Sequence, residues 1–423
     1  MYSVDVIGDF DFLSGAVKIG ELQYERIKGA SSYRFLYDEQ FLNAFPWMRV
    51  SADLGNYPGV QSAQRNIFSF LGDALPDRWG RALIDKRENM LARAENRVPR
   101  LFDDFGYLVH VEDKTRMGAL RFRYMGKYVG ISSDGKEVPP VASLDTFIRE
   151  AQEIEKAESK GLDIPETTWI DNVWKQGSSL GGARPKANVS IDGQLWIAKI
   201  PSVKDNYDIS LWEHFACVLA KKAGIDVAET KLLRIGPTPY HTLLSKRFDR
   251  KGDKRIHFAS SLTLTGLHDG DNAENGKGYI DIVDAMVGDC GVVNPNKYIA
   301  ELYKRVAYNI VIGNQDDHFR NHGFLMTKEG WILSPAYDMN PTLSQYQTLM
   351  ISAKSNRASL KELLEASEDF LLDRRYAGEL IREILGVAKD WKKIAKSVGI
   401  SDQEMSRFAA RIDHSIREGE SLF

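Results

Sequence analysis

The residues best suited to chemistry lie in one short run, Asn314 to Asn321. Asp316 and Asn321 are five residues apart in this run. Kinase-type phosphoryl-transfer enzymes use an Asp and, five residues later, an Asn in one catalytic loop, where the Asp takes the acceptor's proton and the Asn binds magnesium. Asp338 follows seventeen residues after Asn321, where a kinase places its main metal-binding aspartate. The spacing predicts Asp316 as catalytic residue and Asn321 and Asp338 as ligands of Mg²⁺.

A loop of small residues upstream could hold the phosphates of ATP. Small side chains let backbone N–H groups approach phosphate oxygens. Lys199 then ends an apolar strand, as does the kinase lysine that contacts the α- and β-phosphates. Whether Glu213 pairs with Lys199, as a kinase helix glutamate would, is left open. The loop residues predicted to bind the nucleotide are Ser179, Gly181, Gly182, Ala183 and Lys186.

Each of these signals has a plain structural alternative. Asp317 could be an exposed loop charge, and Lys199 could be an ordinary lysine at a strand end. We expect His318 to hold the loop by a hydrogen bond rather than to act as the base, since an adjacent carboxylate fits that role. The order of the parts favours a kinase: a Gly-rich loop, a strand lysine, a helix glutamate, then the two metal-binding loops.

The secondary-structure pattern predicts an α+β, protein-kinase-like two-lobed fold with an N-terminal α/β subdomain and an all-helical C-terminal part. Helices are expected over 61–98, with Asp77 as an N-cap, and over 145–160, 210–223 and 297–312. Asp192-Gly193 predicts a hairpin turn between two strands, and the polar, Gly-rich run 266–278 predicts a mobile loop. The predicted parts are an N-terminal subdomain at 1–125, a linker at 126–143, an N-lobe-like part at 144–255 and a helical C-lobe-like part at 256–423.

Composition limits the classes of protein that the chain can be. The 56 basic and 59 acidic residues give a net charge of −3, so no global charge favours nucleic-acid binding. The sequence lacks a long apolar run and a signal-peptide pattern, which predicts no membrane contact. The chain has only two cysteines, Cys217 and Cys290, which excludes a disulfide framework and suits a cytoplasmic location. We expect both side chains to be buried.

Several motifs together resemble the HipA family, the serine/threonine-protein kinase toxins of bacterial toxin–antitoxin systems. The resemblance covers nearly the whole chain. It rests on motifs in both halves, namely Phe68 to Arg81, Arg116 to Phe122, Ser179 to Lys186, Lys246 to Arg250, Asp316 to Asn321 and Pro335 to Asp338.

The resemblance implies a function and further site residues. It implies an ATP- and Mg²⁺-dependent kinase that phosphorylates a protein Ser or Thr and inactivates itself by autophosphorylation at Ser179. It places the adenine-binding hinge around Lys246 and Phe248, and it assigns His318 to the nucleotide site. The implied partner is a HipB-like helix-turn-helix antitoxin, through which the protein would contact DNA only indirectly.

The sequence departs from the best-known toxins after the hinge. Those toxins carry two acidic residues where this chain reads His257-Phe258-Ala259-Ser260. Their target is an aminoacyl-tRNA synthetase, and the departure leaves the target of this chain open. Two alternatives to the toxin kinase are also left open: a small-molecule or lipid kinase, and an inactive pseudokinase that acts as co-repressor with a DNA-binding antitoxin.

Overall fold

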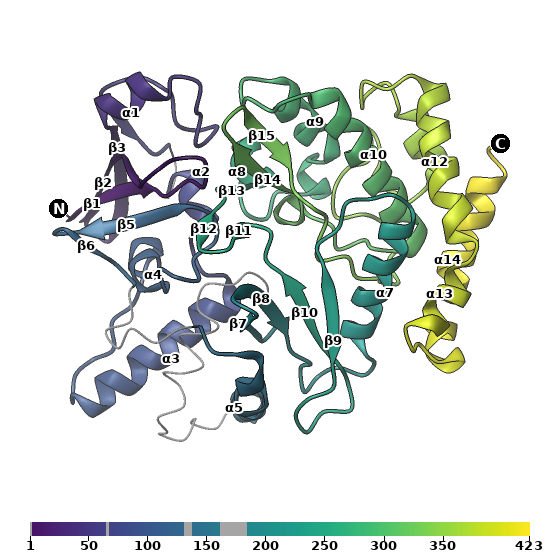
Figure 1. Ribbon diagram of the computed structural model, residues 1–423, viewed down its shortest axis with the longest axis horizontal. Helices are drawn as coiled ribbons and strands as arrows, with labels where there is room; N and C mark the ends of the chain where they lie inside the picture. The colour runs from purple at the N-terminus through teal and green to yellow at the C-terminus, as the bar shows by residue number, and fades with distance from the viewer. Residues whose placement is uncertain (1, 65–66, 131–137, 161–183) are drawn as a thin grey trace. The chain divides into compact units, whose positions relative to one another are not determined.

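The chain forms two compact units in the computed structural model (Figure 1). The first unit comprises Met1–Asn206 and Leu233–Phe258, and the second comprises Tyr207–Leu232 and Ala259–Phe423. The structure describes residues 2–64, 67–130, 138–160 and 184–423. In these residues no helix is both long and apolar enough to cross a membrane.

The first unit begins with a six-stranded antiparallel sheet of order β4-β3-β2-β1-β5-β6. Alternate residues of its central strands are buried, as expected for a sheet with one covered face. The strands are β1 (Tyr2–Gly8), β2 (Val17–Ile27), β3 (Ala30–Tyr37), β4 (Val60–Ser62), β5 (Leu120–Tyr124) and β6 (Lys127–Tyr128). The helices among them are α1 (Glu39–Ala44), α2 (Ser69–Gly72), α3 (Arg78–Ala94) and α4 (Asp104–His110).

A second, smaller sheet has the order β7-β8-β10-β9. Its strands are β7 (Lys186–Ile191), β8 (Gln194–Lys199), β9 (Thr230–Leu233) and β10 (Thr242–Lys246). Val189, Trp196 and Leu244 lie on one face and join a core with buried residues of α3 and of α5 (Leu144–Ser159), which follows the short η1 (Val141–Ser143). The ribbon β11 (Arg250–Lys251) and β12 (Lys254–Arg255) completes this unit.

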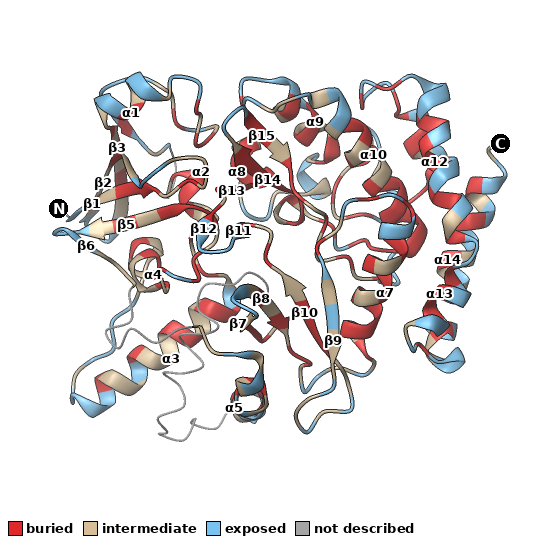
Figure 2. Cartoon of the chain, viewed as in Figure 1, coloured by how far each residue is buried: buried red, intermediate tan, exposed pale blue. Residues whose placement is uncertain are grey.

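The second unit is mainly helical around α10 (Pro295–Ile312), which is buried around most of its circumference (Figure 2). Its small sheet has the order β13-β14-β15. The elements are α7 (Ile209–Lys222), β13 (Phe258–Ser260), α8 (Ser261–Thr265), η2 (Ala273–Asn275), α9 (Tyr279–Val287), η3 (Phe319–Asn321), β14 (Gly323–Thr327) and β15 (Gly330–Leu333). Four helices end the chain: α11 (Leu360–Glu365), α12 (Arg374–Ala388), α13 (Trp391–Ser397) and α14 (Asp402–Glu420).

Local signals predicted most of these elements correctly. Asp77 caps α3, since its carboxylate accepts a hydrogen bond of 2.9 Å from the Gly80 N–H. Asp192 and Gly193 both take positive φ, 50° and 73°, as the tight hairpin turn requires. Cys217 and Cys290 are both buried, and neither forms a disulfide.

One prediction about local structure was wrong. The helix predicted to start at residue 61 does not, because β4 pairs there with β3 as an edge strand. The run 266–278 is a loop, as predicted, that contains only the short η2, whose N-cap Asn272 accepts a hydrogen bond from the Glu274 N–H. Its mobility stays a prediction. The predicted part boundaries at 125, 143 and 255 stay a prediction.

Candidate active site

The candidate catalytic loop starts where α10 ends. Gly313 adopts the left-handed conformation, with φ at 79°, and its N–H bonds to the carbonyl of Asn309. This termination is typical of glycine after a helix, because other side chains strain that backbone. The chain then runs without regular structure to η3 and enters β14. A buried helix and a buried strand therefore hold the two ends of the loop.

The two adjacent aspartates of the loop have opposite environments. The side chain of Asp316 is exposed, whereas Asp317 is 2% exposed. Since a reacting group must reach its substrate, this difference favours Asp316 as the catalytic residue. It also shows that Asp317 is not the exposed loop charge that we considered as an alternative.

Asp317 is the centre of a buried set of hydrogen bonds. Its Oδ2 accepts from the Tyr279 hydroxyl at 2.7 Å, from Asn309 Nδ2 at 2.9 Å and contacts His322 Nε2 at 2.8 Å. Burial would raise the pKa of Asp317, but His322 and Tyr279 outweigh it, so the pKa lies below its ordinary value. Asp317 therefore stays ionised inside the protein and ties the loop to α9 and α10.

The sequence predicts His318 as the histidine that holds the loop by a hydrogen bond, whereas in the structure His322 makes such a contact. The Nδ1 atom of His318 is buried and has no hydrogen-bond partner in the described part of the chain. His322 instead contacts the carboxylate of Asp317 and packs edge-on against Tyr279, with ring centroids 5.7 Å apart. The sequence offered two histidines four residues apart, and only the fold separates their roles.

Asn321 and Asp338 present oxygen atoms suited to a hard cation. The Nδ2 of Asn321 donates to the main-chain carbonyl of Asp316 at 3.2 Å, which leaves its Oδ1 as a ligand atom. Asp338 has a positive φ of 59°, and its Oδ1 accepts a hydrogen bond of 3.2 Å from Asn340 Nδ2. Amide and carboxylate oxygens are the ligands that Mg²⁺ prefers, usually few in number and completed by water and phosphate.

The electrostatics of Asp316 also fit a site that receives a cation. The pKa of Asp316 lies above its ordinary value. Partial burial of the carboxyl raises the pKa most, His318 lowers it, and the nearby carboxylates of Asp338 and Asp317 raise it further. Asp316 and Asp338 thus lie close enough to repel each other. In the described residues no group of three or more His, Cys, Asp or Glu side chains could hold a metal ion. A metal here would use Asn321 and Asp338 with oxygens from outside the chain.

In the first unit, two predicted nucleotide-binding lysines are direct neighbours. Lys186 on β7 pairs with Lys199 on β8, so both side chains lie on the same face of the sheet. That face is opposite to the one that carries Trp196 and Ala198 in the core, since side chains alternate along a strand.

The other residues of the predicted hinge lie differently. Lys246 pairs with Trp196 and lies over its ring, with Nζ 5.9 Å from the centroid. Its side chain therefore points to the face opposite to Lys199. Phe248 packs against Phe258 with ring centroids 6.0 Å apart. These contacts give both side chains structural roles, and nucleotide binding by Lys246 and Phe248 stays a prediction.

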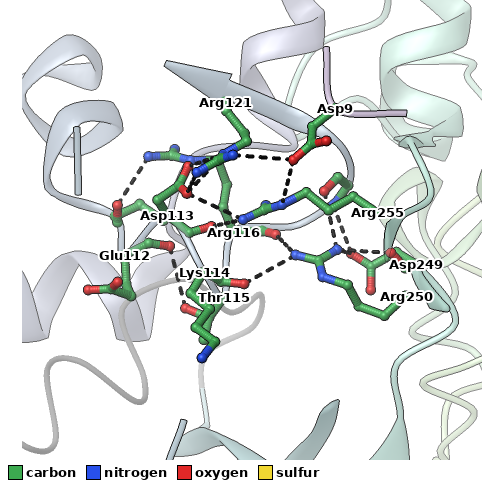
Figure 3. A network of polar contacts seen from close by, with 12 residues as sticks. Asp9, Glu112, Asp113, Lys114, Thr115, Arg116, Arg121, Asp249, Arg250 and Arg255 are labelled. Atoms are coloured by element: carbon green, nitrogen blue, oxygen red, sulfur yellow. Dashed lines mark hydrogen bonds and ion pairs between the residues drawn. The ribbon is translucent and has the colours of Figure 1, made fainter. Parts of the chain in front are cut away.

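The motif that contains this hinge builds a buried network of arginines and aspartates (Figure 3). Asp249, 1% exposed, accepts from Arg247 Nη2 at 2.6 Å, from Arg250 Nη1 at 2.7 Å and from the Gly118 N–H at 2.8 Å. Burial would raise the pKa of Asp249, but Arg247 and Arg250 hold it well below its usual range. Sequence reasoning missed this network.

The same arginines join two distant segments of the chain. Arg247 Nη1 donates to the Thr115 carbonyl at 2.6 Å, and Arg250 Nη2 donates to the Arg116 carbonyl at 2.6 Å. Arg255 Nη2 donates to the Asp113 carbonyl at 2.7 Å. Residues 113–118 are thereby fixed to residues 247–255, so these hydrogen bonds join two of the motifs that carry the family resemblance, Arg116 to Phe122 and Lys246 to Arg250.

The remaining predicted residues lie outside the described part of the chain. They are Ser179, Gly181, Gly182 and Ala183. Of the other predicted residues, Lys186, Lys199, Lys246 and Phe248 belong to the first unit, and Asp316, His318, Asn321 and Asp338 belong to the second.

Comparison with known proteins identifies the family. Residues 178–418, more than half of the chain, match the HipA-like C-terminal domain, and the chain belongs to this family. A putative kinase, Y4dM, of Sinorhizobium fredii is 25% identical over 238 residues, which cover 53% of this chain and 56% of that protein. The serine/threonine-protein kinase toxin HipA of Shewanella oneidensis is 25% identical over 201 residues, 41% of this chain and 46% of that toxin. The chain thus spans about half the length of these curated relatives in the matched stretches.

One solved structure shows the same fold over the whole chain. It is the complex of HipA, HipB and operator DNA from Shewanella oneidensis MR-1. The similarity covers 99% of this chain and 97% of the other, with a TM-score of 0.66 and 17% sequence identity. The α+β fold predicted from the sequence is confirmed by this similarity. The C-terminal part is mainly helical but not all-helical as predicted, because β13, β14 and β15 form a small sheet in it.

Proposed function

We propose that the protein is a HipA-like protein kinase that transfers the γ-phosphate of ATP to a Ser or Thr hydroxyl. The observation that carries the proposal is the contrast within the catalytic loop. Asp316 is exposed, while its neighbour Asp317 is buried and fixed by three hydrogen bonds. Two relatives that carry the name kinase support the same conclusion.

In this mechanism the chain's own residues position groups and move one proton. Asp316 orients the acceptor hydroxyl and takes its proton as the bond to phosphorus forms. Lys186 and Lys199 contact phosphate oxygens and offset their charge. Mg²⁺, when bound to Asn321 and Asp338, neutralises charge on the phosphates. The product is a phosphorylated hydroxyl with ADP as the leaving group.

The direct test is transfer of radiolabelled γ-phosphate from ATP in the presence of Mg²⁺. We expect label on protein with the wild-type chain and almost none with Asp316→Asn. A wild-type chain that labels no protein, neither itself nor any lysate protein, contradicts the kinase proposal. Label found only on a small molecule or lipid would favour the small-molecule kinase that the sequence left open.

We expect Asp338→Ala to remove the magnesium-dependent part of nucleotide binding. Magnesium should strengthen ATP binding to the wild-type protein, and loss of the carboxylate should reduce that gain by roughly 10-fold or more. Calorimetric titrations of ATP, one series with Mg²⁺ and one with EDTA, measure the gain. An unchanged magnesium-dependent gain in Asp338→Ala would rule out Asp338 as a ligand.

We also expect autophosphorylation at Ser179. A phosphate there adds close to two negative charges, which should repel the triphosphate and inactivate the protein. Peptide mass spectrometry after incubation with ATP and Mg²⁺ should find the phosphate on Ser179, and Asp316→Asn serves as the control without transfer. Phosphate on Ser178 instead, or a Ser179 phosphoform that binds ATP normally, would contradict the prediction.

The proposal includes partners. The solved relative forms a complex with HipB and its operator DNA, and we propose a HipB-like antitoxin as partner of this chain, with DNA contacted only through it. The protein substrate is open, and an aminoacyl-tRNA synthetase is the class that the family resemblance implies. We further propose a cytoplasmic location, which suits an ATP-dependent enzyme whose two cysteines form no disulfide.

A further inference from the structure

The buried side chains beneath the catalytic loop form a continuous chain of hydrogen bonds. It starts at Asp317, whose Oδ2 accepts from Asn309 Nδ2 at 2.9 Å. The Oδ1 of Asn309 in turn accepts from Asn314 Nδ2 at 3.1 Å. The Oδ1 of Asn314 accepts from the main-chain N–H of Asn340 at 3.2 Å, and Asn340 Nδ2 donates to Asp338 Oδ1 at 3.2 Å. All five residues belong to the second unit.

This chain reaches the neighbours of every residue that we assign to chemistry in that unit. Asp317 follows Asp316 directly in sequence. His322, which contacts Asp317, follows Asn321 directly. The far end of the chain ends on the carboxylate of Asp338. The two ends of the chain therefore fix Asp317, the direct neighbour of Asp316, and the carboxylate of Asp338 itself.

Burial explains why these links are rigid. Asn309 is 3% exposed and Asn314 is 1% exposed. A buried amide that loses its partner costs the desolvation of that group, about 1–3 kcal/mol, so Asn309 and Asn314 stay in the orientation that satisfies both ends of the amide. Asparagine suits such a chain because its amide N–H donates a hydrogen bond while its amide oxygen accepts one. Two asparagines in series therefore orient each other without adding charge to the interior.

We propose that Asp317, Tyr279, Asn309, Asn314 and Asn340 form a positioning relay that sets the distance between Asp316 and the two metal ligands. The relay does not touch substrate. It acts through Asp316, Asn321 and Asp338, whose relative positions decide both proton transfer and metal binding. Displacements near 1 Å can cost a reaction about 10²-fold, so a relay of this kind has a measurable effect on kcat. The inference rests on the proposed kinase function.

The first test compares two tyrosines that each lose one buried hydroxyl. Tyr279→Phe removes the bond to Asp317, and Tyr303→Phe removes a bond of 3.1 Å from α10 to the carbonyl of Leu363, outside the relay. Both tyrosines are fully buried, so similar losses of stability are expected. We expect kcat to fall roughly 10-fold in Tyr279→Phe and to stay at the wild-type value in Tyr303→Phe, with the KM for ATP unchanged in both.

The second test examines the other end of the relay without using activity. Asn340→Ala removes the bond to Asp338 but keeps the main-chain N–H that bonds to Asn314. Calorimetric titrations of ATP should show the magnesium-dependent gain in affinity reduced roughly 10-fold, and affinity in EDTA unchanged. An equal loss with and without Mg²⁺ would overturn the relay, because it would mean that Asn340 only supports the fold.

The outcomes separate the relay from the function on which it rests. A wild-type protein without phosphate transfer contradicts the kinase proposal. A wild-type protein that transfers phosphate, with equal kcat in Tyr279→Phe and Tyr303→Phe, contradicts the relay alone.

Discussion

Asp316→Asn should lower phosphoryl transfer by roughly 10²-fold or more while ATP binding stays close to the wild-type affinity. The carboxamide keeps the shape of the side chain but cannot take the proton of the acceptor hydroxyl. Because Asp316 is exposed, the exchange leaves no buried group without a partner. The variant should therefore fold normally and lose the chemical step alone.

Single-turnover transfer of labelled phosphate, together with calorimetric ATP binding, measures the two effects separately. Asp317→Asn is the matched control, since its amide oxygen can take the place of Oδ2 and accept from Tyr279 and Asn309. We expect a loss at least roughly tenfold smaller there. If Asp317→Asn lost more transfer than Asp316→Asn, the roles of the two aspartates would have to be exchanged.

The sequence was most informative where a local pattern carries its own physics. Asp192-Gly193 supplied the two residues that tolerate positive φ, so the hairpin of β7 and β8 was predictable with its turn. That hairpin in turn puts Lys186 opposite Lys199. Asp316 and Asn321 are likewise only five residues apart and follow directly after the helix predicted at 297–312. The sequence therefore placed both residues in the segment that follows this helix.

The sequence could not distinguish residues of the same type in neighbouring positions. Asp316 and Asp317 differ only in which one faces the interior, and His318 and His322 differ only in which one reaches that interior carboxylate. These differences depend on α9 and α10, which contribute Tyr279 and Asn309 from distant parts of the chain. No periodicity in the loop itself reports them.

The hinge motif illustrates the same limit over a longer range. The resemblance assigned Lys246 and Phe248 to adenine, and no local pattern indicated what the charged residues between and after them contact. Their partners lie about 130 positions earlier, since the Gly118 N–H and Asp249 are 131 residues apart. A contact of that separation depends on tertiary packing, which a single sequence does not encode in any local pattern.

Asp249→Asn should strongly destabilise the first unit. Arg247 and Arg250 both donate to this carboxylate, and the side chains of Arg247 and Asp249 are each 1% exposed. Removing one partner of a buried ion pair typically costs about 3–5 kcal/mol, because the opposite charge stays buried without compensation. Here the amide has nearly the same shape as the carboxylate, so the loss reports charge rather than packing.

Acid should reproduce the effect of Asp249→Asn in the wild-type protein. The folded-state pKa of Asp249 lies below its ordinary value of 3.8, so the unfolded chain binds this proton more readily. The stability that Asp249 contributes is therefore complete above the ordinary pKa and decreases as the pH falls below it. Asp249→Asn should lack this share of the acid sensitivity.

Native-state hydrogen exchange read by peptide mass spectrometry measures the change in each unit separately. Peptides that contain residues 113–122 or 246–255 should exchange roughly 10²-fold faster in Asp249→Asn, while peptides of α10 and α12 keep their protection. Asp145→Asn is the control, because its ion pair with Arg149 lies at the surface of the same unit and its loss should leave exchange unchanged. Unchanged protection in Asp249→Asn would mean that the arginines find other partners and that the network is not what joins the two motifs.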